Sequence, residues 1–305
     1  MSSTLARIEG ALAARRSGWR GVLADYYELT KPRIIVLLLV TTLAATIMAA
    51  RGIPPLLLTF FTLLGGALAA ASAGAFNCVI DRDVDRLMQR TMLRPVATGR
   101  IEPAAALAFA TGLGLASFAI LYLLVNPLAA WLSLVGNLYY VIVYTIWLKR
   151  ATPLNIVIGG AAGSIPPLVG WAAITNTIGW PAVALAALIF LWTPPHFWAL
   201  AMMVDLDYAK AKIPMLPSVR GVRRTTIEIV LYTIVMVAMS LALVPLHIMS
   251  VWYLAPAAIL GAIFLDGAIR LFRDPTKRRA RALFKFSLLY LALMCLAMVG
   301  DRLIP

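Results

Sequence analysis

The chain has 305 residues, of which 62% are hydrophobic and 13% are charged. Soluble domains carry about 25% charged residues, so the composition excludes an ordinary soluble protein and indicates a membrane protein. The net charge of +14 would suit nucleic-acid binding. The distribution of the basic residues along the chain excludes that class, as shown below.

Nine apolar stretches are each long enough to cross a bilayer of about 30 Å as an α-helix. They lie at residues 34–50, 53–76, 103–125, 127–148, 153–175, 179–203, 227–246, 251–269 and 283–300. The sequence therefore predicts an all-α, polytopic membrane protein with nine transmembrane helices. Residues 1–305 are expected to form a single domain, beginning with a cytoplasmic segment at 1–30.

The basic residues predict the orientation of these helices. If the N-terminus lies in the cytoplasm and the helices alternate, only Arg51 and Arg302 of the 27 lysines and arginines fall outside cytoplasmic segments. This is the positive-inside pattern of membrane proteins, and it places the C-terminus outside. The lipid bilayer is thus an expected partner, and nucleic acid is not.

The first residues resemble neither a spanning helix nor a secretory signal. Residues 1–24 combine arginines with spaced apolar residues and lack a long apolar core. They predict a basic amphipathic helix on the cytoplasmic leaflet. A mitochondrial transit peptide would also be rich in arginine, but Glu9 and the shortage of serine argue against it. Two cysteines, Cys78 and Cys295, are too few for a thiolate metal site or a disulfide framework.

Three oxygen-bearing side chains follow the second apolar stretch at a spacing of four residues. On a continuing helix, Asn77, Asp81 and Asp85 lie on one face. Amide and carboxylate oxygens suit Mg²⁺, which usually shares its remaining positions with substrate phosphate. Acidic residues contribute little to membrane topology, so orientation does not explain them. The pattern predicts a metal–diphosphate site.

Basic residues near this stripe have two interpretations. Arg82, Arg86 and Arg90 keep the same spacing on a neighbouring helix face, where they could hold an anion. Charged residues just past a membrane span usually form a solvated loop that fixes the orientation, and we favour that interpretation for these arginines. Three further basic residues lie at predicted helix ends, where each could contact either a substrate phosphate or a lipid headgroup: Lys31, Arg33 and Lys149.

A second acidic cluster, with Asp205 and Asp207, follows the sixth apolar stretch on the same predicted side. Facing the first cluster, it could hold a second Mg²⁺ on one diphosphate. The sequence leaves open which of the two aspartates binds metal. Lys210 and Lys212 follow directly.

Two other spans carry unusual residues. Residues 155–171 are rich in glycine and contain Pro166-Pro167, which predicts close helix packing and a kink. The small residues would also leave room for a bulky ligand. In the sixth stretch, His196 lies among aromatic residues, and an intramembrane histidine is a functional candidate. It could bind haem iron, contact a carboxylate or donate to a free carbonyl group.

These motifs together resemble a known family. The Asn-Asp-Asp pattern and the second acidic cluster are similar to the UbiA-type intramembrane prenyltransferase superfamily. Blocks similar to the protohaem IX farnesyltransferases, or haem O synthases, lie between residues 29 and 217: LTKPR at 29–33, NCVIDRDVDRLMQRT at 77–91, RPVATGRI at 94–101, YTIWLKRATPLNIVIGGAAGSIPPLVGW at 144–171 and DYAKAKIPMLP at 207–217. Met203 departs from the DxxxD form of the second motif, and Lys212 stands where a small residue is expected.

The resemblance implies an activity and a location. A farnesyl group passes from farnesyl diphosphate to a vinyl group of haem B, giving haem O and diphosphate. Mg²⁺, in two ions, is the implied cofactor, and haem B is a substrate. The implied location is the cell inner membrane, with the active site facing the cytoplasm. A downstream haem-modifying or oxidase-assembly protein is a further implied partner.

The resemblance also implies roles for particular residues. The expected catalytic residues are Asn77, Asp81, Asp85 and Asp207, and the same four with Asp205 are the expected metal ligands. The expected diphosphate-binding residues are Lys31, Arg33, Arg86, Arg94, Tyr144, Lys149 and Lys210. The expected haem-binding residues are His196, Trp192 and Trp198.

Two alternatives remain. One is a prenyltransferase of the same type that acts on an aromatic or quinone-precursor acceptor. The other is a transporter or channel with intramembrane acids. Transport sites usually lie near the bilayer midplane on broken, repeated helices, whereas these acids lie at the predicted cytoplasmic edge.

Overall fold

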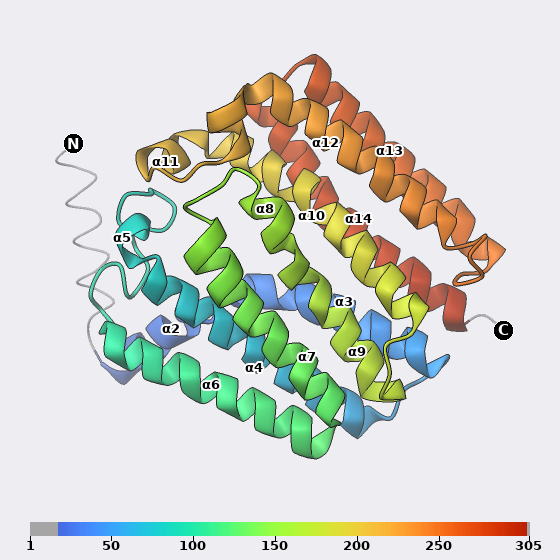
Figure 1. Cartoon of the computed structure of the whole chain (residues 1–305), viewed down its shortest axis with the longest axis horizontal. Coiled ribbons are helices and arrows are strands. Elements are labelled where there is room, and N and C mark those ends of the chain that lie inside the picture. The colour runs from blue at the N-terminus through green and yellow to red at the C-terminus, as the bar shows by residue number, and fades with distance from the viewer. Residues whose placement is uncertain (1–17, 304–305) are drawn as a thin grey trace.

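The computed structural model describes residues 18–303, and these residues are helical without strands (Figure 1). Nine of their helices are long and apolar enough to cross a membrane, which confirms the predicted fold class. They are α3 (Pro32–Ala50), α4 (Leu56–Ile80), α6 (Pro103–Leu124), α7 with the π-helix η1 (Pro127–Leu148), α8 with η2 and α9 (Asn155–Thr175), α10 (Trp180–Met203), α12 (Leu216–Ala242), η3 with α13 (Val251–Arg273) and α14 (Lys277–Leu303).

The helices pack as two groups that share a long boundary. In one group α4 contacts α6, α6 contacts α7, α7 contacts α9, and α9 contacts α3. In the other, α10 contacts α12 and α14, and α13 packs on both α12 and α14. Contacts of α3 with α14 and of α9 with α10 join the groups, and Figure 1 shows α6 and α13 at opposite flanks.

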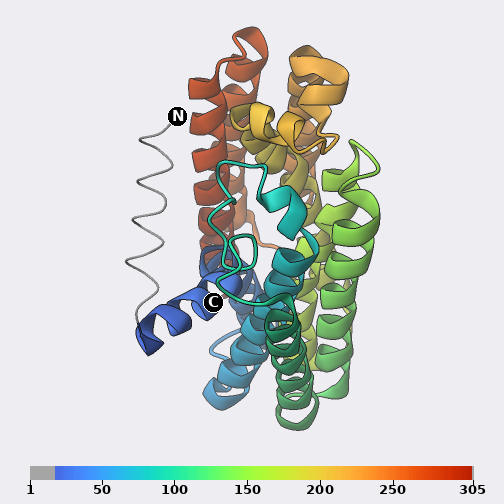
Figure 2. The same cartoon turned by 90° about the vertical axis from the view of Figure 1, so that its left-hand side faces the viewer.

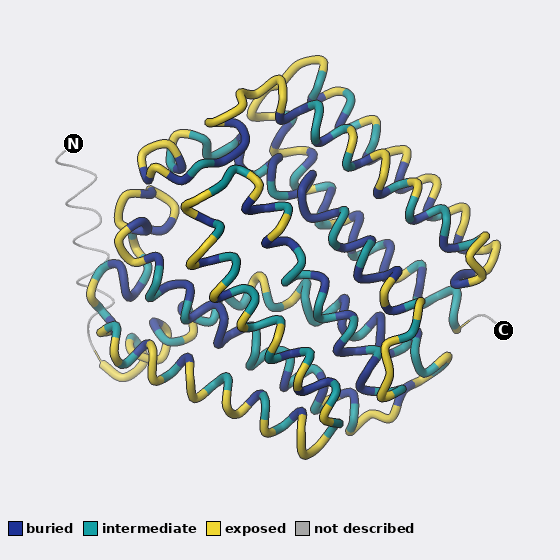
Figure 3. Tube along the Cα trace, viewed as in Figure 1, coloured by how far each residue is buried: buried dark blue, intermediate teal, exposed yellow. Residues whose placement is uncertain are grey.

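Burial separates the inner helices from those that face lipid (Figure 3). In α10, 67% of the apolar window is buried inside the protein, compared with 17% in α6. Exposed side chains such as Leu115, Leu123 and Ile259 cover the outer faces of α6 and α13. Since the bilayer interior is as apolar as these side chains, their exposure there carries little cost. The inner helix α10 therefore supplies the main scaffold.

Three short helices gather at one end of the bundle, which we call the site end. They are α2 (Trp19–Leu29), α5 (Arg82–Asp85) and α11 (Asp205–Lys210). Figure 2 looks onto this end and shows the loop after α5 beside α11. The irregular loop segments at this end lie outside the spanning segments, where water can satisfy their backbone polar groups.

The amphipathic helix predicted at 1–24 can be compared with the structure only from residue 18 onwards. There, α2 leaves Trp19, Val22 and Leu23 exposed, while Asp25 and Leu29 are buried against the bundle. The apolar face turned away from the protein suits the bilayer surface. The earlier part of the predicted helix lies outside the described residues.

The glycine-rich fifth span is broken, although the break lies before the two prolines. It consists of α8 (Asn155–Gly159), the 3₁₀-helix η2 (Gly160–Ser164) and α9 (Ile165–Thr175). A Cβ atom on Gly159 would lie 2.2 Å from Cδ2 of Tyr144, and one on Gly170 would lie 2.2 Å from the carbonyl oxygen of Thr42. These glycines therefore serve close helix packing.

We predict that Gly170→Ala destabilises the protein by about 2 kcal/mol, because the new methyl group forces α3 and α9 apart. The change is measured as a lower thermal midpoint in detergent. Gly112→Ala is the matched control, since no heavy atom lies within 4 Å of its Cβ position. Equal midpoints for the two variants would contradict the packing argument.

Candidate active site

The predicted face of oxygen ligands forms at the site end. The helix α4 ends at Ile80 and α5 begins at Arg82, but the amide of Asp81 donates to the carbonyl of Asn77 at 2.9 Å. The amide of Asp85 donates to the carbonyl of Asp81 at 2.8 Å. The four-residue hydrogen-bonding pattern thus continues through the junction, and Asn77, Asp81 and Asp85 are all buried. The side chain of Asp83 is 61% exposed and pairs with Arg150.

The predicted arginine stripe does not form. The helix α5 ends at Asp85, so Arg90 lies in the following loop and not on the same helix as Arg82. Arg82 is exposed, and Arg86 donates from Nε to the carbonyl oxygen of Ala97 at 2.7 Å. The interpretation as one helix face fails because it extended helical spacing past the end of α5, whereas the interpretation as a loop agrees with the exposed Arg82 and Arg90. In this part of the chain, Arg86 supports the loop backbone.

Asp81 is the most enclosed member of the site, with no exposed side-chain surface. Its Oδ2 accepts hydrogen bonds from Lys149 Nζ and, at 2.8 Å, from Asn77 Nδ2. Its Oδ1 accepts no hydrogen bond, although Arg150 Nη2 lies 3.9 Å away. A buried carboxylate oxygen without a hydrogen-bond donor is unusual and suits a metal ligand.

Asn77 connects three segments of the chain. Its Oδ1 accepts a hydrogen bond from Lys31 Nζ, and its Nδ2 also donates to Thr145 Oγ1 at 3.1 Å. Lys31 adopts a left-handed conformation with φ of 54° just before Pro32, which begins α3. Burial lowers the pKa of Lys31 to about 8.

Asp85 forms the third pair, with Arg94. The Nη1 atom of Arg94 donates to both carboxylate oxygens of Asp85, at 2.9 and 2.7 Å. Burial opposes the charge on Arg94, but the Asp85 carboxylate outweighs this effect and raises the pKa of the guanidinium group. Each of the three oxygen-bearing residues therefore contacts a basic side chain: Lys31, Lys149 or Arg94.

The π-helix η1 (Tyr139–Leu148) brings the partners of this face into position. Thr145 Oγ1 donates to the carbonyl of Tyr140 at 2.9 Å, five residues earlier, while accepting from Asn77. Tyr144 packs on Gly159, and Lys149 follows at the end of η1. π-Helices are rare and often occur at functional sites. Sequence reasoning missed Thr145, because no residue pattern signals a change from α- to π-helical spacing.

The second acidic cluster divides between two neighbours. Asp207 Oδ2 accepts from the backbone amide of Arg90 at 3.4 Å, and the hydroxyl of Tyr208 accepts from Arg90 Nη2 at 2.8 Å. Asp205 instead forms an ion pair with Lys277 of α14 at 2.8 Å. The loop after α5 and helix α11 are therefore in contact (Figure 2), and Asp207 is the aspartate that faces this loop.

The remaining predicted diphosphate ligands lie further out. Arg33 and Lys210 are both exposed, and the structure describes no contact between either side chain and Asn77, Asp81 or Asp85. Lys212, the departure from the family pattern, has a φ of 53°. A small residue such as glycine adopts that conformation at least cost, which explains the expected pattern.

His196 is enclosed in the bundle. Its ring stacks on Trp192, with centroids 4.3 Å apart, and on Phe284 at 4.7 Å. Its Nδ1 lies 2.6 Å from Ser287 Oγ, whose hydroxyl donates to the carbonyl of Phe284 at 2.7 Å. With the hydroxyl proton directed to that carbonyl, Nδ1 is assigned as the donor and Nε2 keeps its lone pair.

The two tryptophans near His196 lie in different surroundings. Trp192 donates from Nε1 to the carbonyl of Ser287 at 2.9 Å. Trp198 is buried and packs edge-on against Tyr232, and its Nε1 has no hydrogen-bond partner. Trp192 therefore belongs to the same cluster as His196, and Trp198 points to a separate part of the core.

The acidic residues alone do not make a complete metal site. Among residues 18–303, no three histidine, cysteine, aspartate or glutamate side chains are grouped to hold a metal ion. The amide oxygen of Asn77 and ligands from outside the protein would have to complete the coordination. That requirement suits Mg²⁺, which often shares substrate phosphate oxygens.

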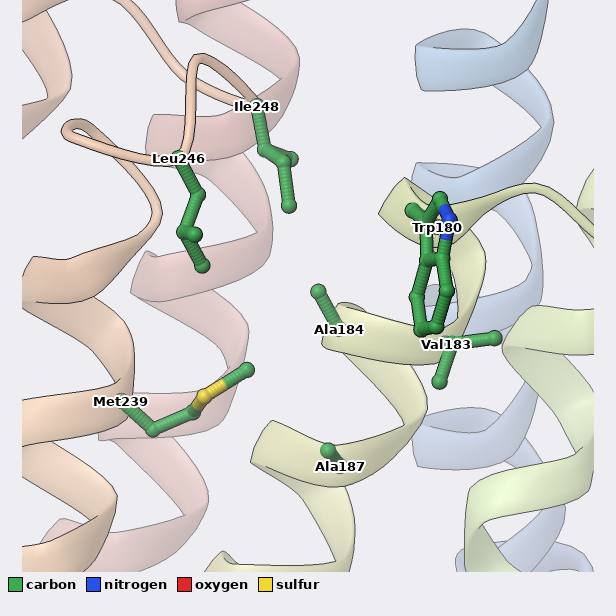
Figure 4. A pocket seen from close by; sticks show the side chains of 7 residues that line it. All are labelled: Trp180, Val183, Ala184, Ala187, Met239, Leu246 and Ile248. Carbon is green, nitrogen blue, oxygen red and sulfur yellow. The ribbon is translucent and has the colours of Figure 1, made fainter.

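A pocket of about 510 Å³ lies away from these residues (Figure 4). Trp180, Val183 and Ala184 from the start of α10 face Leu246 and Ile248 across it. The acidic cluster follows the other end of α10, about 36 Å away along a helix of this length. This pocket is apolar and has no acidic lining, so its size does not make it the reaction site.

Comparisons with known proteins identify the family of this chain. The model of the UbiA prenyltransferase family matches residues 38–293. A protoheme IX farnesyltransferase of Gloeobacter violaceus is 55% identical over 92% of both chains. One from Synechocystis sp. is 54% identical over 92% of this chain and 90% of the relative.

Solved structures share the fold at low sequence identity. A UbiA homologue of Archaeoglobus fulgidus bound to GPP and Mg²⁺ has a TM-score of 0.66 at 19% identity, covering 90% of this chain and 99% of that one. A structure of a digeranylgeranylglyceryl phosphate synthase has a TM-score of 0.76 at 19% identity, covering 92% and 98%. The family match and the close relatives together show that the chain belongs to the UbiA prenyltransferase family.

Proposed function

We propose that this protein transfers the farnesyl group of farnesyl diphosphate to a vinyl group of haem B, producing haem O and diphosphate. The observation that carries the proposal is the buried face of Asn77, Asp81 and Asp85, each in contact with a basic side chain. Relatives more than half identical over most of the chain are protoheme IX farnesyltransferases, which favours haem as the acceptor.

The residues present fit Mg²⁺. Asp81 Oδ1 has no hydrogen bond, and the carboxylates of Asp81 and Asp85 with the amide of Asn77 are oxygen ligands of the type that Mg²⁺ prefers. Asp207 faces the same loop and would hold a second ion, while the Lys277 ion pair makes Asp205 the weaker candidate. When bound, Mg²⁺ would neutralise charge that develops on the departing diphosphate.

The basic side chains have a role of their own. Lys31, Lys149 and Arg94 are held at the site by amide or carboxylate oxygens. An arriving diphosphate can take over these donors, because its oxygens accept the same charge-assisted hydrogen bonds. As the C1–O bond of the substrate breaks, its electron pair goes to the diphosphate, whose growing charge these cations stabilise. The protein needs no nucleophile for this step.

The acceptor step then forms a carbon–carbon bond. The terminal vinyl carbon of haem attacks C1 of the farnesyl cation, and the positive charge moves to the vinyl carbon next to the porphyrin ring. Water adds there and loses a proton, leaving the hydroxyl group of haem O. A largely apolar bundle interior would protect the first cation from water until the vinyl group attacks.

His196 is the proposed haem contact. Its Nδ1 donates to Ser287, so Nε2 has the lone pair required of an iron ligand. Trp192 stacks on the imidazole and would limit its rotation. The opposing interpretation is structural, because the same stacking and hydrogen bond satisfy a buried histidine without any ligand.

The two alternative functions are less well supported. An aromatic or quinone-precursor acceptor would use the same diphosphate site, but relatives that are 54% and 55% identical are protoheme IX farnesyltransferases by name. A transporter is disfavoured because the acidic residues lie at helix ends and not within the spanning segments. A haem-modifying or oxidase-assembly protein that receives the product remains a proposed partner, testable by co-purification.

The first prediction concerns transfer itself. Purified protein supplied with farnesyl diphosphate, haem B and Mg²⁺ should release diphosphate and yield haem with the mass of haem O. Asp81→Asn and Asp85→Asn should each reduce this rate by about 100-fold or more, since each removes a carboxylate ligand of the Mg²⁺ that would neutralise the departing diphosphate.

Asp83→Asn is the matched control for both variants. Its carboxylate is exposed and paired with Arg150, so transfer should stay within about twofold of the original rate. Equal losses in Asp83→Asn and Asp85→Asn would show that the buried face is not the reaction site. Transfer to a quinone precursor in place of haem would favour the alternative acceptor.

A second prediction addresses the haem contact. His196→Ala should weaken haem binding and shift the Soret band, while farnesyl diphosphate affinity stays nearly unchanged. His247→Asn is the control, since His247 is exposed at the other end of the bundle and asparagine tolerates its φ of 56°. An unaltered Soret band with unaltered haem affinity would assign His196 a structural role.

A third prediction concerns orientation in the cell inner membrane. We propose that the whole chain is one prenyltransferase domain whose site end faces the cytoplasm, because basic residues are concentrated on that side. Reporter fusions should place the N-terminus inside and the C-terminus outside. Both termini on one side would be incompatible with nine crossings.

A further inference from the structure

Arg100 ties the N-terminal helix to the loop between α5 and α6. Its Nε donates to both carboxylate oxygens of Asp25 in α2, at 3.0 and 3.1 Å. Its Nη2 donates to the carbonyl oxygen of Leu93 at 3.0 Å and lies 3.5 Å from Glu28 Oε2. The side chain of Arg100 is only 4% exposed, and that of Asp25 is 10% exposed. This is a nearly buried ion pair that joins two segments far apart in sequence.

One residue, Leu93, connects this ion pair to the active site. Arg100 donates a hydrogen bond to the carbonyl of Leu93, and Leu93 directly precedes Arg94. The guanidinium group of Arg94 in turn contacts Asp85. Residues 86–101 contain no helix long enough to fix the position of Arg94 by themselves. The loop therefore depends on side-chain contacts, among which are Arg86 with Ala97 and Arg100 with Asp25.

The helix α2 is itself well anchored. Leu29 is fully buried, and the ring of Tyr26 packs edge-on against Phe109 of α6 with centroids 4.9 Å apart. Its outer face, with Trp19 and Leu23, is exposed toward the expected bilayer surface. Asp25 thus projects from a fixed element and can hold Arg100, and through it the loop, in one place.

We propose that Asp25 and Arg100 are positioning residues for Arg94, and that they set the affinity of the site for the diphosphate group of the substrate. This inference rests on the proposed function, in which Arg94 binds diphosphate. A guanidinium group can hold a carboxylate and a backbone carbonyl at once in a fixed fork, which an ammonium group cannot. Without the fork, Arg94 would sample other positions and meet the diphosphate less often.

The test measures binding of farnesyl diphosphate with Mg²⁺ to the purified full chain, in the absence of haem. Asp25→Asn and Arg100→Lys should each raise the dissociation constant about tenfold, as is typical when a supporting residue behind a ligand is lost. The affinity for haem B should not change. In turnover, the KM for farnesyl diphosphate should rise more than kcat falls.

Two control variants separate positioning from general stability. Asp25→Glu keeps the carboxylate and should restore most of the affinity that Asp25→Asn loses. Arg270→Gln breaks an exposed ion pair with Asp266 on α13, away from the loop, and should leave binding unchanged. Folded Asp25→Asn and Arg100→Lys proteins with the original affinity would overturn the inference, as would an equal loss of haem and farnesyl diphosphate binding.

Arg94→Gln distinguishes failure of this inference from failure of the proposed function. If Arg94→Gln weakens diphosphate binding and the Asp25 and Arg100 variants do not, the site stands and the positioning role is refuted. If Arg94→Gln also binds normally, Arg94 is no diphosphate ligand, and both the inference and that part of the proposed function are wrong.

Discussion

Burial of the Asp81 carboxylate is the constraint on which the rest of this structure depends. An ion removed from water costs several kcal/mol unless partners in good geometry replace its hydration. Asp81 obtains them from Lys149, at the end of η1, and from Asn77, one turn earlier on α4. Asn77 on α4 also binds Lys31, at the start of α3, and Thr145 on η1. The relative positions of these three helices at the site end are therefore fixed by the same set of hydrogen bonds. The packing of the outer helices can vary more freely.

Several departures from regular helix structure lie around this carboxylate. The chain bends at Asp81, α7 changes to a π-helix before Lys149, and Lys31 has a positive φ. By contrast, α6 runs for 22 residues without a break and faces lipid. Lipid offers no hydrogen bonds to distorted backbone, so irregular segments are tolerated only where protein or water satisfies them. Irregular backbone therefore accompanies the acidic residues at the site end, although positive φ values also occur in the turns at Arg51, Asn176 and His247.

The sequence was sufficient for features that depend on local periodicity and much less so for contacts across the bundle. Apolar length predicted the nine spanning helices, and four-residue spacing predicted the shared face of Asn77 and Asp81. The same spacing wrongly placed Arg90 on this helix, because no residue pattern directly after Asp85 indicates that α5 ends there. Thr145 and Asp25 were missed since their partners lie 68 and 75 residues away, at a separation no local pattern encodes.

The pairing of each acidic or amide group with a basic side chain has a consequence for substrate binding. A cluster of unpaired lysines and arginines at this depth would repel one another, and a cluster of bare carboxylates would repel diphosphate. In the proposed site, the carboxylates of Asp85 and Asp81 would hold Arg94 and Lys149 in place until a diphosphate with its metal ions arrives. The anion would then pair with the cations, and the carboxylates would be the residues that hold the metal. Such an exchange of partners conserves the number of charge-assisted contacts and limits the free-energy cost of opening the site.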